Sequence, residues 1–142
     1  MKKELIERLA LYLSANELFR GEPATAAQIV QAEEQLGVTF DRDYSEFLSL
    51  FGGSYVGVPV YGFNNCAMLS RETVLDLTTR FRASYEPQQR WPLLARSYVM
   101  SMTGTGDPVS INPRGEIVVF RHEQGEEEVL AGSFPELLAQ NL

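Results

Sequence analysis

Residues 29–53 read IVQAEEQLGVTFDRDYSEFLSLFGG and hold the most specific pattern in this chain. Just before them, Thr25 and Gln28 have the spacing of a capping box, in which each side chain binds a backbone N–H of the first helical turn. Gly37 can adopt the positive φ that commonly ends a helix. The pattern therefore predicts a helix from about Ala26 to Gly37. Its inner face is predicted to hold Ile29, Ala32 and Leu36.

A second helix is predicted to follow directly. Asp41 is a natural N-cap, because its carboxylate can accept hydrogen bonds from the free backbone amides of a first helical turn. The apolar residues that follow have the i, i+3, i+4, i+7 spacing of one helical face, and Gly52 and Gly53 stop the helix. Helical spacing of this kind usually means burial. The residues predicted to enter the core here are Tyr44, Phe47, Leu48 and Phe51.

The order of these features resembles the SUKH superfamily, the Smi/Knr-type domains that include many bacterial toxin-immunity proteins. The similar features are an acidic helix ending in Leu-Gly at residues 36–37, a short hydrophobic link, Asp-Tyr-x-x-Phe-Leu at residues 43–48, and a Gly-Gly stop. Many members carry Leu-Pro before the acidic-Tyr pair, whereas this chain has Phe40 and Asp41, and Asp41 can cap the helix that Pro would start. The resemblance implies binding, not catalysis.

The remaining helices are predicted from the same kinds of signal. The first spans residues 3–19 and ends at Gly21, and a later one spans residues 71–85 with Ser70 as its N-cap. Residues 86–96 are predicted to form a loop whose tryptophan packs back on the core.

Short strands are predicted between and after these helices. Residues 55–63 are rich in β-branched and aromatic side chains, with Pro59 indicating an edge or a break. From residue 97 the chain reads as strands separated by turn residues, and strands so close together can only be joined antiparallel. Ser133 and Glu136 form a capping box before a short last helix, which resembles the family's Ser-Phe start to that helix. The later strands are predicted at residues 97–102, 108–112, 116–122 and 127–131.

Together these elements predict an α+β fold. N-terminal helices and a short C-terminal helix would pack on one side of a mainly antiparallel sheet of about five to six short strands. The SUKH fold is of this type. The other face of such a sheet can face water, which would leave it open to a partner.

The length and composition are those of an ordinary globular protein. The 142 residues suit a single domain over 1–142, with 1–21 as a leading helix and 22–142 as the region of family resemblance. There is no run of about 18 apolar residues and no signal-peptide pattern at the start, so we expect a cytoplasmic protein without a membrane segment. Cys66, the single cysteine, cannot form an internal disulfide and is predicted to be a small buried hydrophobe.

The net charge is −7 and it is unevenly distributed. Residues 21–70 hold six acidic side chains against a single base, and residues 97–142 hold seven against two. Residues 71–96 instead hold five arginines against three acids. A mostly acidic surface repels phosphates, which argues against direct nucleic-acid binding and favours a basic protein partner. The competing explanation is that the acidity serves only solubility.

Catalytic patterns are weak. The string GTGD at residues 104–107 could bring backbone amides near a phosphate, but no lysine follows and it lies between strands, so a tight turn closed by Asp107 is predicted. His122 is the one candidate general base near neutral pH, with only Ser101 or Ser110 as conceivable partners and no Gly-x-Ser-x-Gly elbow. One thiol and one histidine cannot make a usual zinc site. We expect a non-enzymatic protein without a cofactor or metal, and an enzyme using Asp107 and His122 is the least favoured alternative.

The favoured function is an immunity protein that binds a basic toxin domain, a nuclease being one kind, and covers its active site. An acidic inhibitor would match the positive charge that a nuclease presents to phosphates and would accelerate the encounter. The alternative is a regulatory or scaffold interaction module of the Smi/Knr type. The bland explanation of the acidic groups is a solvated hairpin edge and helix caps. The candidate partner contacts are Asp41, Asp43, Glu46, Tyr55, Tyr61, Glu126, Glu127 and Glu128.

Overall fold

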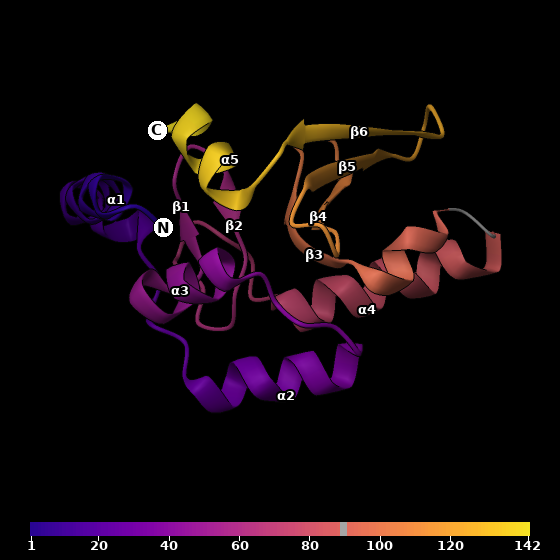
Figure 1. The fold of residues 1–142 in the computed structure, drawn as a ribbon, viewed down its shortest axis with the longest axis horizontal. Coiled ribbons are helices and arrows are strands. Elements are labelled where there is room, and N and C mark those ends of the chain that lie inside the picture. Colours follow the sequence, from indigo (N-terminus) through magenta and orange to yellow (C-terminus); the bar gives the residue numbers. More distant parts are fainter. Residues whose placement is uncertain (89–90) are drawn as a thin grey trace.

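The computed structural model describes residues 1–88 and 91–142 and has an α+β fold (Figure 1). The first half is mainly helical and the second half holds most of the strands. Its helices are α1 Lys3–Ala15, α2 Ala26–Leu36, α3 Arg42–Phe51, α4 Val74–Tyr85 and α5 Phe134–Asn141, with 3-10 turns η1 Glu17–Phe19, η2 Glu86–Gln88 and η3 Pro92–Arg96. Its strands are β1 Ser54–Tyr55, β2 Pro59–Val60, β3 Tyr98–Met102, β4 Pro108–Ile111, β5 Ile117–Arg121 and β6 Glu126–Ala131.

The helices α2 and α3 form as the sequence predicts. The hydroxyl of Thr25 accepts from the backbone N–H of Gln28, and the Gln28 side chain accepts from the backbone N–H of Thr25. The carboxylate of Asp41 accepts from two backbone N–H groups, 3.1 Å from each nitrogen, at the start of α3. Gly37 has a φ of 68° at the end of α2. Tyr44, Phe47, Leu48 and Phe51 are all buried, and so are Ala32 and Leu36, whereas Ile29 is half-buried.

The first helix is shorter than predicted. α1 ends at Ala15, because the Asn16 side chain donates to the carbonyl of Tyr12 and the backbone then turns into η1. Gly21 therefore does not end α1. It allows a close approach of two chain segments, since a Cβ at Gly21 would lie 2.2 Å from the carbonyl oxygen of Gly53.

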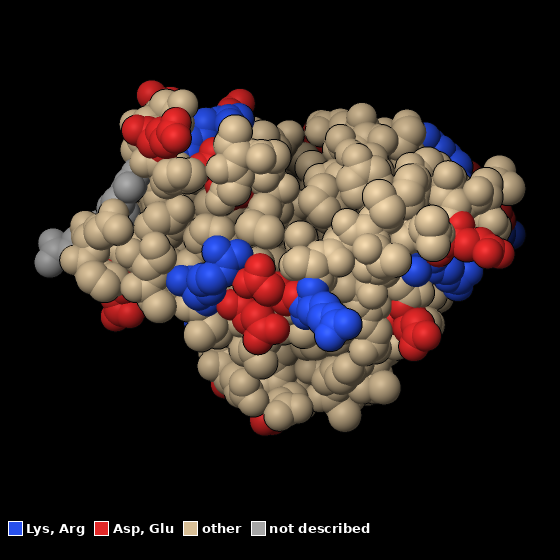
Figure 2. Space-filling view, turned by 180° about the vertical axis from the view of Figure 1, so that it is seen from behind, with Lys and Arg blue, Asp and Glu red and all other residues tan. Residues whose placement is uncertain are grey.

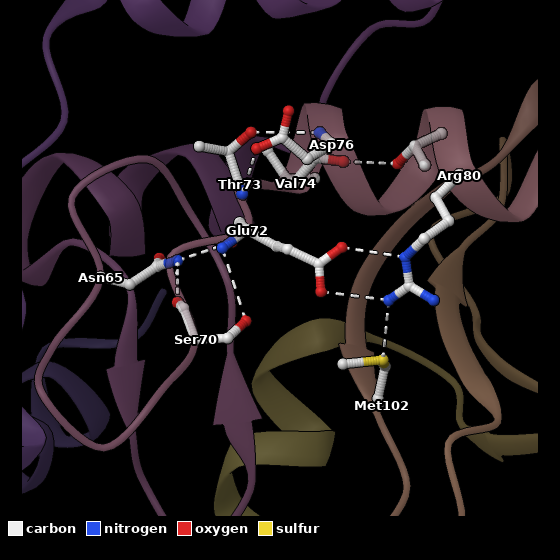
Figure 3. Close-up of polar contacts among 9 residues, drawn as sticks. Asn65, Ser70, Glu72, Thr73, Val74, Asp76, Arg80 and Met102 are labelled. Carbon is white, nitrogen blue, oxygen red and sulfur yellow. Dashed lines mark hydrogen bonds and ion pairs between the residues drawn. The ribbon is translucent and has the colours of Figure 1, made fainter.

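The start of α4 corrects the prediction of a helix at residues 71–85 capped by Ser70. The N-cap is Thr73, which forms a capping box with Asp76 (Figure 3). The chain before Thr73 cannot be helical because the Asn65 amide holds it in a loop by donating to the carbonyls of Ser70 and Glu72. Thr73, unlike Ser70, has an acid three residues later, and this acid completes the capping box.

The six strands divide into two antiparallel sheets. β1 and β2 form a small hairpin, and the other four lie in the order β3-β4-β5-β6. The backbone N–H of Tyr61, just after β2, donates to the carbonyl of Met100 in β3 at 2.8 Å and so connects the two sheets. All pairings in the larger sheet are antiparallel, as the short connections require.

Both faces of the larger sheet are covered over β3, β4 and β5, so the prediction of an open face is wrong for these strands. One face carries Met100, Ile111 and Val119 into the main core, which also includes residues of α1, α2, α3 and α5. The opposite face carries Val99 and Phe120 into a second cluster, which lies between the sheet and α4 and is here called the cluster beneath α4. Figure 1 shows α4 on this side of the sheet. The exposed part of the sheet is instead β6, whose residues 126–129 are exposed.

The second cluster also includes the segment predicted as a loop at residues 86–96. Most of this segment forms two short 3-10 turns, and residues 89–90 lie outside the described part. Trp91 packs against Tyr85 and Phe120, with ring centroids 4.8 Å and 5.2 Å away, as predicted for the tryptophan of this segment. Cys66 is buried, as predicted.

The last helix begins at the predicted Ser133 cap. The hydroxyl of Ser133 accepts from the backbone N–H of Glu136, whose carboxylate reaches back to the N–H of Gly132 at 2.8 Å, one residue earlier than in a standard capping box. Within residues 1–88 and 91–142, every helix is too short or too polar to cross a bilayer.

Candidate protein-binding surfaces

The acidic candidate contacts form two separate groups. The first, here called the α3 acidic cluster, consists of Asp41, Asp43 and Glu46 around the first turns of α3. The second, the β6 acidic triplet, consists of Glu126, Glu127 and Glu128 at the start of β6. Figure 1 places α3 and the β5–β6 hairpin tip at opposite sides of the molecule. Figure 2 shows small, separated groups of charge on the rear face, with acidic side chains at the hairpin tip in the upper left.

The α3 acidic cluster is engaged in internal contacts. Asp41 caps α3, as described above. The α-ammonium of Met1 lies 2.8 Å from a carboxylate oxygen of Asp43 and 2.6 Å from one of Glu46. These hydrogen bonds, first to Asp43 and then to Glu46, raise the pKa of the Met1 α-amino group above its ordinary value. Part of the negative charge of this cluster is therefore compensated before any partner arrives.

The β6 acidic triplet is less compensated. Arg121 forms an ion pair with Glu128 at 2.8 Å and lies opposite Glu126 across the strand pair. Within the described part of the chain, no ion pair or hydrogen bond reaches the carboxylates of Glu126 and Glu127. All three side chains are exposed. This triplet is thus the stronger of the two acidic groups as a surface for a basic partner.

The two tyrosine candidates lie in different environments. Tyr55 is half-buried and stacks edge-on against Phe19, with ring centroids 5.3 Å apart. Tyr61 is only 7 % exposed and belongs to the cluster beneath α4. Its backbone joins the two sheets, so Tyr61 serves the core, and its side chain offers little surface to a partner.

Two of the five arginines in the basic segment at residues 71–96 are engaged in internal contacts. Arg80 makes two hydrogen bonds to the carboxylate of Glu72, at 2.9 and 3.1 Å (Figure 3). Arg82 donates to the carbonyls of Leu36, Leu94 and Ser97, and burial lowers its pKa. These two arginines therefore add less free positive charge to the surface than the composition of the segment suggests.

The structure brings Asp107 and His122 together, as the enzyme alternative requires. The carboxylate of Asp107 accepts from the backbone N–H of His122 and also contacts the imidazole Nδ1. Asp107 also accepts from Thr105, so it closes the β3–β4 turn as predicted. The hydroxyls of Ser101 and Ser110 are buried and have no hydrogen-bond partner among the described residues. The pair therefore ties a turn to the end of β5, and neither Ser101 nor Ser110 is hydrogen-bonded to it.

Some features of the surface were not predicted from the sequence. Leu11 and Leu18 are 74 % and 67 % exposed, although an apolar residue in a helical segment usually points inward. Val129 is 55 % exposed beside the β6 acidic triplet. A pocket of about 500 Å³ lies between the end of α4 and η3. Its lining residues are Arg82, Tyr85, Glu86, Trp91, Pro92, Leu94 and Ala95.

Comparison with known proteins identifies the family. No curated protein matches the sequence. A SUKH family described as SMI1-KNR4 cell-wall matches residues 2–142. The match includes α1, which lay outside the best part of the resemblance seen in the sequence. The Asp-Tyr-x-x-Phe-Leu motif that suggested this family forms the buried face of α3. The chain belongs to the SUKH (SMI1-KNR4) family.

Proposed function

We propose that this chain is an immunity protein that binds and neutralises a cognate toxin domain in the cytoplasm. Members of the SUKH family are generally non-enzymatic domains that act as immunity proteins or as Smi/Knr-type interaction modules. A protein partner is therefore the starting point of the proposal. The toxin partner goes beyond the family assignment and is inferred from the charge and the exposed surface of the chain, whereas the cytoplasmic location is the expectation drawn from the sequence.

The observation that carries the proposal is the exposed and incompletely paired β6 acidic triplet. Glu126 and Glu127 have no ion-pair partner among the described residues, and the only base paired with Glu128 is Arg121 from the neighbouring strand. A nuclease domain must present positive charge to phosphates, so such a toxin would be attracted to this edge. The acidic charge of the inhibitor would accelerate its encounter with that positive surface, and once bound the inhibitor would exclude the nucleic acid.

The first experiment is capture of partners with the purified chain as bait. The prey are the recombinant products of adjacent genes and a lysate of the source cells, each washed at low and high salt. The proposal expects one stoichiometric complex with a toxin domain, weakened at high salt because long-range attraction between exposed charges is screened. A regulatory enzyme or signalling protein captured in its place would contradict the immunity function.

The charge of the triplet is tested by substitution. Replacing Glu126, Glu127 and Glu128 by Lys should slow association with the captured toxin by at least about tenfold at low salt. The matched control replaces three other exposed acids, Glu4, Glu7 and Glu17, by Lys and so changes the net charge equally. Equal association rates for the two variants would contradict the electrostatic part of the proposal.

The second candidate is a regulatory or scaffold module. The observation that favours it is the family's own description, which refers to SMI1-KNR4 and the cell wall. The location of the gene separates the two functions. A toxin reading frame immediately upstream favours immunity, whereas a stand-alone gene favours regulation.

A further inference from the structure

β6 is a free edge of the larger sheet. In the described part of the chain β6 pairs only with β5, and Figure 1 shows no other element beyond it along the upper rim. The opposite edge is β3, and it is already partly occupied, because the N–H of Tyr61 donates to the carbonyl of Met100 in β3. An edge strand presents a row of backbone N–H and C=O groups that another chain can pair with. The β6 edge is therefore the side of the sheet at which a strand can be added.

The regular part of this edge is short. Cα pairing with β5 runs without interruption from Arg121 opposite Glu126 to Val118 opposite Val129. The register then shifts, and Ile117 lies opposite Ala131. A bulge of this kind twists a strand and interrupts pairing. The segment that can accept a regular strand is thus residues 126–129.

The side chains of this segment define what kind of strand fits beside it. Because successive side chains alternate between faces, Glu126 and Glu128 lie on one face, with Val119 as the cross-strand neighbour of Glu128. Glu127 lies on the other face, opposite Phe120, and shares that face with Val129. Each face of the edge therefore carries at least one carboxylate. An added strand needs positive charge on both of its faces and an apolar side chain next to Val129.

The same carboxylates disfavour a second copy of the chain. Two β6 edges paired with each other would place the acidic triplets side by side, and like charges on adjacent strands are destabilising. Natural edge strands commonly use charges in this way to prevent self-association. A basic strand meets no such repulsion, so the triplet selects between the two occupants.

We infer that the protein partner binds by adding a basic β-strand to the free edge of β6 at residues 126–129. Main-chain hydrogen bonds to the edge supply affinity, and Lys or Arg side chains next to the triplet supply selectivity. This inference rests on the proposed function, since it assumes a protein partner, and it names the contact by which that partner is held.

The test uses the whole isotope-labelled chain and a synthetic peptide, Lys-Thr-Lys-Lys-Val-Lys-Thr, with both ends blocked, which as a strand carries Lys on both faces and Val on one. One control peptide has the same sequence with all internal amides N-methylated, which keeps the charge and removes strand pairing along both edges. We expect shift changes and slowed amide exchange at residues 126–129 with the unmodified peptide. N-methylation should raise the Kd at least about tenfold, because several backbone hydrogen bonds are lost.

Two outcomes would overturn the inference. One is equal affinity for the two peptides, which would reduce the interaction to charge alone. The other is a binding response centred on any surface other than β6. The triple Lys variant of the triplet should lose peptide binding while the control variant at Glu4, Glu7 and Glu17 keeps it. The peptide comparison on the unaltered chain does not depend on how these variants fold.

The same exchange measurement separates this inference from the proposed function. In a captured toxin complex, unchanged exchange at residues 126–129 would overturn strand addition and leave the immunity function standing. Peptide binding at β6 without any captured toxin would support the edge site and count against the immunity function.

Discussion

The hydroxyl of Tyr44 donates a hydrogen bond of 2.6 Å to the backbone carbonyl of Tyr61. Tyr44 is fully buried in α3, and burial raises its pKa well above the usual value, so the hydroxyl keeps its proton and remains a donor. The backbone N–H of Tyr61 donates in turn to Met100 of β3. The tyrosine of the family motif therefore connects α3, through the segment after β2, to the larger sheet.

The first prediction concerns this bond. Tyr44→Phe should lower the free energy of unfolding by about 1–3 kcal/mol, because it leaves a buried carbonyl without its side-chain donor. Urea unfolding followed by circular dichroism measures the change. Tyr12→Phe is the matched control, since Tyr12 is half-buried and no hydrogen bond of its hydroxyl occurs within the described residues. Equal losses in the two variants would show that the Tyr44 bond adds no stability of its own.

The second prediction concerns the N-cap of α3. Asp41→Ala removes the acceptor of two backbone N–H groups and should cost about 0.5–2 kcal/mol of unfolding free energy. Asp41→Asn keeps an oxygen at the same place and should cost much less. If the two variants unfold at the same urea concentration, capping is not the role of Asp41.

Local signals with a definite chemical mechanism predicted the fold well. The Thr25 and Asp41 caps were predicted because a side-chain oxygen at the right spacing satisfies a backbone donor regardless of distant structure. The four later strands were predicted because turn residues limit where the chain can reverse. The prediction of Ser70 as the cap was wrong because the Asn65 side chain holds the loop before α4. No pattern in the sequence predicts this contact.

The surface was harder to predict than the core. The burial of Tyr61 depends on α4 packing against the second face of the larger sheet, and no pattern in the sequence assigned this helix to that face. The pairing of Asp43 and Glu46 with Met1 joins residues more than 40 positions apart, which no spacing rule reports. The exposure of residues 126–128 was foreseen because three adjacent acids are rarely buried. That β6 would be the edge strand depends on strand order, which the sequence left open.

The third prediction compares two glycines with positive φ. A Cβ at Gly52, whose φ is 71°, would lie 1.9 Å from the carbonyl oxygen of Glu22, and the N–H of Glu22 is itself held by Asn64. At Gly37, whose φ is 68°, a Cβ would meet nothing within 4 Å. Gly37→Ala should therefore cost only the strain of the left-handed conformation, about 1–2 kcal/mol.

Gly52→Ala adds a backbone clash, and the ψ of −168° at Gly52 lies in a region that is essentially restricted to glycine, so this variant should destabilise the chain much further. Thermal unfolding of both variants, followed by circular dichroism, measures the difference. A Gly52→Ala protein as stable as Gly37→Ala would mean that the segment around Glu22 moves freely away from α3.

The last prediction concerns whether α1 is part of one domain with the rest of the chain, as we propose. Leu9 is fully buried in the main core, whereas Leu11 on the same helix is 74 % exposed. Leu9→Ala should lower the free energy of unfolding by about 2–5 kcal/mol, while Leu11→Ala should change it by less than about 0.5 kcal/mol. The helix propensities of the two substitutions are the same, so the comparison isolates burial. A single unfolding transition shifted by Leu9→Ala, observed both by circular dichroism and by Trp91 fluorescence, would show that α1 and the distant cluster beneath α4 unfold together. If Trp91 instead reported an unshifted transition, α1 would belong to a separate unit, and the domain proposal would be wrong.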